Sequence, residues 1–506
     1  MGEKVLFLVD VEVPSSIWNR RKFSEGMQYR SLNVLHKALS PLPHGVLLGP
    51  VLLSTILKQQ GYAVEILECS FRPQQRRNLM AALRENPDYI ALSSTFIMDT
   101  ATMQAHVEFL RQHAPGAKII LGGASVTANA EMRTLADYCI VGEGEHALPS
   151  LLQAIRLGVP APPLVHAPLL KDLDGGVTPD WSLLRRSPGE FHMIYTQRGC
   201  KWRCAFCTFP AKEGYKLRYR AVGKVIEEIK RNYEEFGIWR YMIADSTFTF
   251  PEDRCLELLR EISALPFRVE WAAYARVDTI SDEMAKLMVD SGCVGLFFGM
   301  ESGSDLVLEK MKKQFTVRQM RRAGEILRGH RIPFTASWIV GFPGETPATI
   351  EETYRAIVEL GADHNSINTF GLYEDSPTGL RKEVFGLEGF GMDWKHATMD
   401  STQALEHTET LVSRVQAEGV PIGSIFDYFW LSAAGISSVQ VAELFQQAQR
   451  IQNAPAAGDR EDFEEKCELI FRKAVSHPAF APREFFSGAG ISPSPRPLLS
   501  STAARS

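Results

Sequence analysis

Two long series of short apolar runs, each followed by a helix-like pattern, constrain the fold of this chain more than any other feature of its sequence. The first series occupies about the first 150 residues. Runs that are buried on both faces and joined by helices are typical of a parallel, doubly wound sheet. We expect strands at 4–9, 63–67, 89–94, 117–123 and 137–145, with helices at 49–60, 74–85 and 101–113 between them.

The second series begins near Phe191 and contains six strand–helix units in succession. Six units are fewer than a closed (βα)8 barrel needs, so we expect an incomplete parallel barrel with its active site at the carboxyl ends of the strands. The expected strands are 191–197, 239–245, 268–275, 294–300, 334–342 and 364–370, and the expected helices are 221–236, 251–264, 282–291, 316–329 and 346–360.

Composition divides the rest of the chain. A stretch rich in proline, leucine and glycine separates the two series and looks like a connector rather than an element. From about residue 376 the strand pattern fades, and amphipathic patterns at 401–417 and 460–474 favour helices. We therefore expect a Rossmann-like domain over 1–155, a linker over 156–188, a partial barrel over 189–375, a helical domain over 376–490 and a disordered tail over 491–506.

Charge and hydropathy exclude several classes of function. A net charge of −5 gives no sign of a broad nucleic-acid-binding surface. The N-terminus lacks the pattern of a secretory signal, and the longest apolar stretch, 45–57, is interrupted by Pro50 and is too short to span a membrane. We expect a cytoplasmic protein, and in a reducing compartment clustered cysteines bind metal or perform redox chemistry more often than they form disulfides.

Three of the eight cysteines lie together directly after the first strand of the second series, at Cys200, Cys204 and Cys207. A structural zinc site normally takes four ligands, often as two pairs, and no second C-x2-C pair exists in the sequence. Three thiolates on a four-iron cluster would leave one iron open to an external ligand, which makes a reactive site. The alternative is that these cysteines only pack as small hydrophobic residues, which would explain a single cysteine better than three at this spacing.

The motif C-x3-C-x-aromatic-C, with Phe206 as its aromatic residue, resembles the signature of radical S-adenosylmethionine (SAM) enzymes. That family has a partial (βα)6 barrel as its core. The resemblance implies a 4Fe-4S cluster on the three cysteines, whose open iron binds the amino and carboxylate groups of SAM. One-electron cleavage of SAM would then give a 5′-deoxyadenosyl radical that abstracts a substrate hydrogen.

Four later motifs extend this resemblance in the expected order: MIADSTFTF, WAAYARVD, FFGMESGSDLVLEKMKK and WIVGFPGET. They match positions that in the family contact the amino group, the carboxylate and the adenine of SAM, the carboxylate position being Arg276. The alternatives are a barrel salt bridge for Arg276 and a buried arginine partner for Glu301. The resemblance assigns SAM binding to Phe206, Asp245, Ser246, Arg276, Glu301, Ser302, Gly341 and Gly344.

The first series resembles cobalamin-binding domains, including the turn VGEGE at 141–145. In the standard domain a histidine ligates cobalt from below, but Val46 occupies that position, and His44 lies two residues too early. The resemblance implies cobalamin held without a lower axial histidine; the alternatives are a sheet that binds no cobalamin and glycines that only make tight turns. The implied cobalamin residues are Val46, Ser93, Ser94, Thr95, Gly122, Gly123, Gly142 and Glu143.

A cobalamin domain beside a radical SAM core implies a methyltransferase that uses SAM and methylcobalamin to methylate an unactivated carbon, or phosphorus, of a small biosynthetic intermediate. The alternatives are a cobalamin-dependent or cobalamin-free radical SAM enzyme that performs cyclisation, rearrangement or methylthiolation, and a non-catalytic cobalamin or cluster sensor. The implied partners are a small-molecule substrate and an electron donor such as ferredoxin or flavodoxin, with no nucleic acid and no membrane. Substrate contacts, or alternatively lid packing, are expected after the sixth strand at Tyr373, Glu374, Trp394 and His396.

Overall fold

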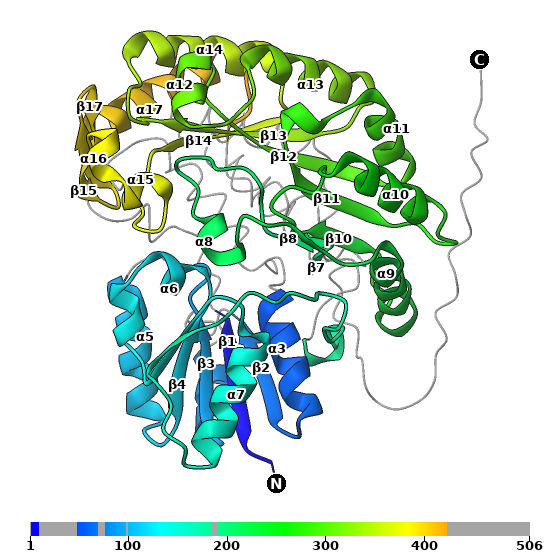
Figure 1. The fold of residues 1–506 in the computed structure, drawn as a ribbon, viewed down its shortest axis with the longest axis vertical. Helices are drawn as coiled ribbons and strands as arrows, with labels where there is room; N and C mark the ends of the chain where they lie inside the picture. Colours follow the sequence, from blue (N-terminus) through cyan, green and yellow to red (C-terminus); the bar gives the residue numbers. More distant parts are fainter. Residues whose placement is uncertain (1, 10–47, 69–75, 98–99, 185–190, 423–506) are drawn as a thin grey trace, which may run out of the picture.

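The computed structural model describes residues 2–9, 48–68, 76–97, 100–184 and 191–422, which form two stacked α/β units. The N-terminal unit lies at the bottom of Figure 1 and the second unit above it. In both units the carboxyl ends of the sheet strands carry the predicted site residues.

The N-terminal sheet is parallel throughout, in the order β2-β1-β3-β4-β5-β6. The strand order reverses beside β1, and doubly wound sheets bind ligands at such a switch point. The expected doubly wound fold is therefore confirmed. The strands are β1 Lys4–Val9, β2 Ala63–Glu68, β3 Tyr89–Ser93, β4 Lys118–Gly122, β5 Tyr138–Val141 and β6 Leu164–His166.

Alternation along β1 shows why helices cover both faces of this sheet. Val5, Phe7 and Val9 belong to the core that also contains residues of α3 and α7, whereas Leu6 and Leu8 pack in the core formed with α4 and α5. Successive side chains of a strand point to opposite faces, so a fully apolar strand requires both layers. The helices are α3 Leu48–Gln59, α4 Arg76–Arg84, α5 Thr100–His113, α6 Ala124–Ala128 and α7 Gly144–Arg156.

The second sheet has six parallel strands in the order β14-β13-β12-β11-β10-β7. Neighbours in the sheet are neighbours in sequence, and β7 and β14 are its two edges, so the barrel remains open within the described residues. This is the predicted incomplete barrel. The strands are β7 His192–Ile194, β10 Arg240–Ile243, β11 Glu270–Ala275, β12 Cys293–Glu301, β13 Phe334–Val340 and β14 His364–Thr369.

The helices around this sheet begin and end at local signals. Thr316 and Thr346 form capping boxes at the starts of α13 and α14, and Gly237 ends α9 in the left-handed conformation. Such signals explain why the predicted bounds differ from the observed ones by only a residue or two. The helices are α9 Val222–Phe236, α10 Glu252–Ser263, α11 Asp282–Asp290, α12 Asp305–Lys310, α13 Val317–Gly329 and α14 Pro347–Leu360.

Two stretches differ from expectation. The proline-rich stretch after α7 is not only a connector, because β6 within it pairs with β5 as an edge strand of the N-terminal sheet. Its three residues, two half-buried and one exposed, are too few to show a hydrophobic period. Beyond residue 376, a small antiparallel sheet precedes α17 Ser401–Ala417, which itself matches the predicted helix. That sheet consists of β15 Glu388–Phe390, β16 Asp393–His396 and β17 Met399–Asp400.

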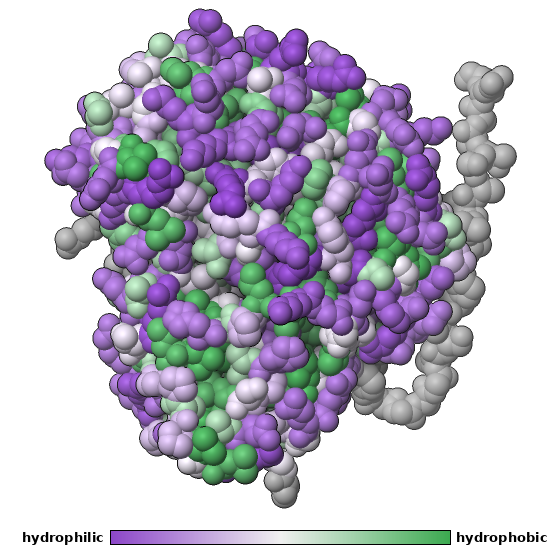
Figure 2. Space-filling view, viewed as in Figure 1, coloured by the Kyte–Doolittle hydropathy of each residue, from purple (hydrophilic) through white to green (hydrophobic). Residues whose placement is uncertain are grey.

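The predicted helix at 460–474 and the predicted tail lie outside the described residues. On the face shown in Figure 2, hydrophilic residues dominate the upper unit, and hydrophobic residues are more frequent on the lower one. Among the described residues, no helix is both long enough and apolar enough to cross a bilayer.

Candidate functional site

The three predicted cluster cysteines lie on one loop between β8 (Gln197–Arg198) and α8 (Phe209–Glu213), just after β7. Backbone hydrogen bonds fix this loop: Cys200 N–H donates to Gly214 O at 3.1 Å, and Cys207 N–H donates to Cys204 O at 3.2 Å. All three thiols are free. The loop therefore presents three reduced sulfurs from an ordered backbone at the carboxyl end of the sheet.

The electrostatics of the loop fit an iron–sulfur cluster. Burial raises the pKa of the Cys207 thiol to about 12, and the pKa of Cys200 is also raised, first by burial and then by the neighbouring Cys204. The positive charge of Arg276 lowers the pKa of Cys200, and that of Lys313 lowers the pKa of Cys207, which partly offsets these increases. Buried thiolates need such cations or a metal, because burial disfavours the charged form.

Within the described ranges, no three His, Cys, Asp or Glu side chains converge closely enough to hold a single metal ion. A four-iron cluster takes each thiolate on a different iron, so its ligands lie farther apart than those of one ion. Three thiols on one loop are a donor set that fits such a cluster.

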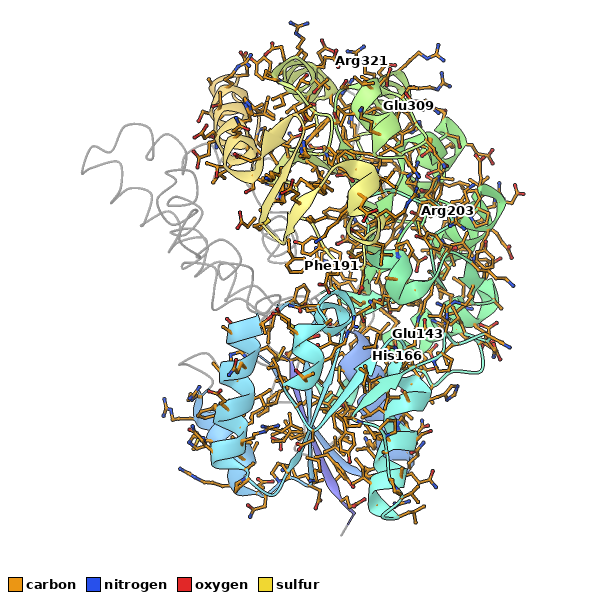
Figure 3. All side chains as sticks on the ribbon, turned by 60° about the vertical axis from the view of Figure 1, so that its left-hand side comes forward. Glu143, His166, Phe191, Arg203, Glu309 and Arg321 are labelled. Atoms are coloured by element: carbon orange, nitrogen blue, oxygen red, sulfur yellow. The ribbon has the colours of Figure 1, made fainter. Side chains whose placement is uncertain are left out.

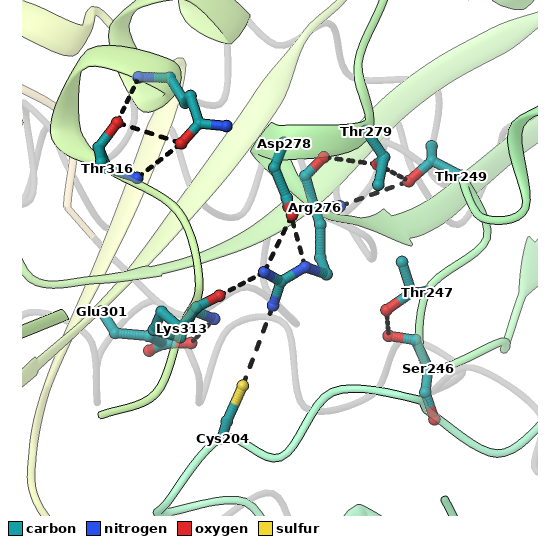
Figure 4. A network of polar contacts seen from close by, with 11 residues as sticks. Cys204, Ser246, Thr247, Thr249, Arg276, Asp278, Thr279, Glu301, Lys313 and Thr316 are labelled. Atoms are coloured by element: carbon teal, nitrogen blue, oxygen red, sulfur yellow. Dashed lines mark hydrogen bonds and ion pairs between the residues drawn. The ribbon is translucent and has the colours of Figure 1, made fainter. Parts of the chain in front are cut away.

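Arg276, at the end of β11, connects the cysteine loop to its surroundings (Figure 4). Its Nε donates to Asp278 Oδ1 at 2.9 Å, and its Nη1 lies 3.9 Å from Cys204 Sγ. The guanidinium also stacks over the Trp202 ring at 4.2 Å from its centroid. The salt bridge that was the alternative interpretation is therefore present, and the same side chain faces the cluster loop.

Glu301 forms an ion pair with Lys313, with 3.3 Å between Oε1 and Nζ. Both side chains are buried, and burial raises the pKa of the Glu301 carboxyl. The partner is a lysine, not the arginine considered from the sequence. Lys313 also faces the ring of Phe206, with its Nζ 5.6 Å from the ring centroid. The pair therefore borders the cysteine loop from the side of β12.

Asp245 and Ser246 follow β10, and the structure gives both side chains protein partners. Asp245 Oδ1 accepts from the N–H groups of Thr196 and Gln197 at 2.8 and 3.1 Å. Complete burial raises the pKa of the Asp245 carboxyl to about 6. Ser246 Oγ donates to Glu213 Oε2 at 3.0 Å. Both residues therefore shape the backbone that leads into Cys200, and SAM contact by them stays a prediction.

Gly341 follows β13 with φ +96°, and a Cβ there would lie 2.8 Å from the Trp394 ring. Only glycine fits this positive φ and close approach. The Gly341 N–H donates to Glu345 Oε2 at 2.5 Å, and its carbonyl accepts from His396 Nε2 at 3.0 Å. Phe206 reaches the same turn, with its ring 6.5 Å from that of Phe342. The motif aromatic thus contacts the glycine motif.

The remaining SAM candidates occupy supporting positions. The Ser302 and Thr353 hydroxyls lie 3.3 Å apart, and Ser302 Oγ accepts from Ser304 N–H at 3.2 Å. Gly344 has φ +89° and packs against the Lys310 side chain. These contacts hold the loops after β12 and β13 against α14 and α12.

The predicted cobalamin residues of the first domain meet at the ends of β3 and β4. Ser94 N–H donates to Gly122 O at 2.7 Å, and Ser94 Oγ accepts from Val126 N–H of α6 at 3.1 Å. Gly123 has φ +110°, and a Cβ there would lie 2.7 Å from Thr95 Oγ1. A tight turn therefore requires Gly123, as the alternative interpretation held. Ser93 Oγ lies 3.3 Å from Thr95 Oγ1, and Val46 lies outside the described residues.

Glu143, beside Gly142 in the turn before α7, is buried at the junction of the two units (Figure 3). Its carboxylate accepts two hydrogen bonds from Arg218, both at 2.8 Å. Arg198 lies 3.3 Å away and Leu170 N–H donates at 2.5 Å. The side chain is thus occupied by protein partners, and its contact with cobalamin stays a prediction.

The four substrate candidates separate into two groups. Trp394 is buried, donates from Nε1 to Phe370 O at 2.8 Å and stacks on His396. Both residues therefore support Gly341, which agrees with lid packing. Tyr373 is half-buried and Glu374 is exposed, in the loop after β14. Thr378 of α15 (Pro377–Leu380), the short helix after that loop, donates its N–H to Ala205 O at 2.9 Å, so this segment touches the cysteine loop.

Sequence reasoning missed several residues that organise this site. Glu213 accepts hydrogen bonds from Gly199 N–H at 3.3 Å and from Ser246 Oγ. The sequence carries one signal for it, because Glu213 is the only acidic residue in segment 198–220, which contains seven lysines and arginines. Lys313 and Glu345 belong to motifs already quoted, but their partners are fixed only in three dimensions. The missed residues are Arg198, Glu213, Arg218, Lys313 and Glu345.

Comparison with known families matches two parts of the chain. Residues 194–357 match the profile of the Radical SAM superfamily, and residues 45–152 match that of the B12 binding domain. These ranges coincide with the second and the first βα series. The profiles therefore account for the open barrel and for the doubly wound sheet separately.

Curated relatives match more than half of the chain at low identity. An uncharacterized methyltransferase of Pyrococcus horikoshii is 26% identical over 351 residues, which cover 64% of this chain and 75% of the relative. An anaerobic magnesium-protoporphyrin IX monomethyl ester cyclase of Cereibacter sphaeroides is 27% identical over 336 residues, covering 59% of this chain. The chain spans only about half of that cyclase, 54% of its length.

Among solved structures, the radical SAM methyltransferase TsrM from Kitasatospora setae, with tryptophan and a SAM analogue bound, has a TM-score of 0.64. It is 17% identical, and the match covers 89% of this chain and 99% of TsrM. At this identity the likeness shows the fold, which includes both units. The chain therefore belongs to the cobalamin-dependent radical SAM enzymes, and within them it is similar to the methyltransferases.

Proposed function

We propose that this enzyme transfers a methyl group from SAM, by way of cobalamin, to an unactivated carbon or to phosphorus in a small biosynthetic intermediate. One observation carries the proposal: α8, which directly follows the loop with Cys200, Cys204 and Cys207, packs on α6 of the B12-binding domain (Figure 1). A radical generator and a methyl carrier are then neighbours. Methyltransferases among the relatives support the reaction type.

When bound, the 4Fe-4S cluster, SAM and cobalamin would provide the reductive cleavage of SAM and a transferable methyl group, chemistry that no amino-acid side chain provides. The chain's own residues bind and orient them. The three cysteines would hold the cluster, and Arg276 and Lys313 would offset its charge from buried positions. Arg276, which already faces Cys204, would orient the SAM carboxylate through a rearranged pairing with Asp278.

We infer that cobalamin is held without a lower axial histidine, because Val46 occupies the position at which related domains place that ligand. An alkyl side chain has no lone pair for cobalt. Conversion of Val46 to histidine should shift the visible spectrum of the bound cob(III)alamin toward that of a histidine-ligated form. An unchanged spectrum would mean that this position does not lie below the cobalt.

Electrons for the cluster would come from an acidic redox protein such as ferredoxin or flavodoxin. Segment 198–220 carries seven bases and one acid in a chain of net charge −5, and that acid, Glu213, is buried. Lys201, Arg203 and Lys216 are exposed, and within the described part of the chain none of them pairs with a carboxylate. A positive surface beside the cluster loop would steer an acidic donor to it.

The decisive experiment uses anaerobically reconstituted enzyme, SAM with a deuterated methyl group, dithionite and candidate intermediates. Methyl transfer predicts 5′-deoxyadenosine and a product heavier by one labelled methyl group. A cyclisation, which the cyclase relative favours as the second candidate, predicts 5′-deoxyadenosine and a product without the label. A protein that folds but retains no cobalt from cobalamin-fed cells would contradict methyl transfer by way of cobalamin and leave a cobalamin-free cyclisation as the candidate.

A further inference from the structure

An ion-pair network joins the B12-binding domain to the cluster domain through the VGEGE turn. The Glu143 carboxylate accepts a hydrogen bond from each Nη atom of Arg218, both at 2.8 Å. Arg198 Nη1 lies 2.7 Å from Glu145 Oε1. The exposed fractions of these four side chains are only 5–13%. Both arginines belong to the β8–β9 hairpin of the second unit, in which β9 is Arg218–Tyr219.

The pairing geometry has the properties of a rigid joint. A bidentate guanidinium–carboxylate contact fixes orientation as well as distance. Despite burial, the pKa of Glu143 is lowered, because the hydrogen bonds from Arg218 and Leu170 favour its charged form. Arg218 also donates to Leu170 O and to Glu213 O, at 2.7 and 2.8 Å. The carboxylate thus stays ionised among donors from Leu170 and Arg218.

The hairpin passes this constraint directly to the cluster loop. Gly199 and Cys200 follow Arg198 in sequence, and Cys200 N–H donates to Gly214 O. Gly199 N–H donates to Glu213 Oε2, whose backbone carbonyl is held by Arg218. A displacement of Glu143 would therefore reach Gly199, the residue before the first cluster cysteine, through three successive contacts, by way of Arg218 and Glu213.

The Glu143–Arg218 pair is the first tie between the two domains, and a second tie, the Arg133–Asp375 pair, lies elsewhere along the same junction. Arg133, in the 3-10 helix Glu131–Thr134 after α6, donates to the last carbonyls of α6 and lies 3.7 Å from Asp375 Oδ2. Asp375 belongs to the loop that leads from β14 into α15, and Thr378 of α15 donates to Ala205 O, between the second and third cysteines. Both ties therefore run from a strand-end segment of the first sheet to the cysteine loop.

We propose that Glu143–Arg218 and Arg133–Asp375 are positioning pairs that set the separation between cobalamin and the cluster, and that the VGEGE carboxylates serve this joint instead of contacting cobalamin. The inference rests on the proposed function. Methyl transfer requires the two groups, held by different domains, at a fixed approach, and misplacement by an ångström can cost on the order of a hundredfold in rate. The buried, bidentate Glu143–Arg218 pair and the less buried Arg133–Asp375 contact together supply such a constraint across the junction.

The test uses reconstituted full-length enzyme with cob(II)alamin and the reduced cluster, whose spin–spin coupling in EPR reports their separation. Glu143→Gln and Asp375→Asn should retain iron and cobalamin but weaken or spread this coupling, and Arg218→Lys should give an intermediate change. The rate at which SAM methylates the reduced cobalamin should fall roughly ten- to a hundredfold. Glu283→Gln breaks the exposed Arg260–Glu283 pair and should change neither readout.

Unchanged coupling in the variants at both ties would overturn the proposal. Loss of cobalamin from Glu143→Gln, with normal coupling in Asp375→Asn, would also overturn it by making the carboxylate a cobalamin contact. Asp375, with 22% of its side chain exposed, keeps the test valid if changes at the more buried tie prevent folding. Absence of any methylated product in the wild type would defeat the proposed function but leave the coupling measurement intact.

Discussion

Arg276 Nη1 lies 3.9 Å from Cys204 Sγ while the same guanidinium is ion-paired with Asp278 at 2.9 Å. One side chain thus joins the end of β11 to the middle cysteine of the cluster loop. A planar guanidinium can make these contacts at once because its donors lie in a fixed fork. The relationship gives a direct test of the SAM-binding role expected from the sequence.

Arg276→Lys should weaken SAM binding at least about tenfold, a loss of roughly 1.4 kcal/mol, because an ammonium cannot reproduce the forked contact. Equilibrium binding of SAM to the reconstituted enzyme measures the effect, and iron content should stay constant. Arg260→Lys, in an exposed pair with Glu283, is the matched control. Equal SAM affinity in the two variants would assign Arg276 to the salt bridge alone.

Cys204→Ala should abolish 5′-deoxyadenosine formation and reduce bound iron, since two thiolates cannot hold a four-iron cluster in an open loop. Cys255→Ala removes an equally buried thiol on α10 and should keep both. Iron analysis and quantitation of 5′-deoxyadenosine after SAM and dithionite check the pair. Retained iron in Cys204→Ala would reject the proposed ligand set.

Gly341→Ala should destabilise the protein by about 2–5 kcal/mol, the sum of a left-handed alanine and overpacking. The added Cβ would lie 2.6 Å from Ala404 Cβ and 2.8 Å from the Trp394 ring. Gly223→Ala, in α9 with nothing within 4 Å of the added Cβ, should be neutral or stabilising by up to about 1 kcal/mol. Chemical unfolding of both variants measures the difference, and similar values would contradict the packing seen at Gly341.

Much of this architecture was predictable because its signals are local. Thr316 and Gln319 form the capping box that starts α13, and the apolar strand 4–9 alone requires helices on both faces of its sheet. The spacing of Cys200, Cys204 and Cys207 likewise predicts that they share one loop. Chains that fold uniquely carry such agreement between local and global signals.

The rest depends on contacts distant in sequence. Glu143 is the clearest case: its motif was recognised, but its partner Arg218 lies 75 residues away in another domain. Trp394 was considered as a substrate contact, yet it packs behind Gly341. Its position was not predictable, because the short strand that carries it shows no periodic pattern in the sequence. Side-chain partners across domains leave no trace in a single sequence.

Glu345 should make stability depend on pH. Burial raises the pKa of Glu345 to about 8 from an ordinary value of 4.5. The free energy of unfolding of the protein is therefore highest below pH 4.5, where the carboxyl is neutral in both states, and it falls as pH rises through 8. Each pKa unit corresponds to about 1.4 kcal/mol. Glu345→Gln should lack this decline, as measured by urea unfolding between pH 5 and about 9.

The exposed Glu309, labelled in Figure 3, provides the control for that titration. Glu309→Gln should keep the wild-type decline in unfolding free energy. Parallel pH profiles for wild type and Glu345→Gln would mean that the carboxyl is charged in the folded state at neutral pH.

The basic surface beside the cluster loop should control electron delivery but not the chemistry that follows. Lys201→Glu combined with Arg203→Glu should slow SAM cleavage about tenfold or more when reduced flavodoxin is the donor, because the charge that steers an acidic partner is reversed. Cleavage driven by dithionite should be unchanged, since that small reductant needs no docking surface. High salt should diminish the difference between wild type and variant.

Arg321, on α13 at the far end of the upper unit in Figure 3, is the matched control for this charge reversal. It is exposed and paired with Glu359, so Arg321→Glu changes the net charge without touching the cluster loop. Steering by net charge alone would slow this variant half as much as the double reversal, whereas a local docking surface leaves it at the wild-type rate. Equal slowing with dithionite and flavodoxin in the double variant would instead mean that Lys201 and Arg203, which stack on Phe250 and Tyr215, hold the loop itself.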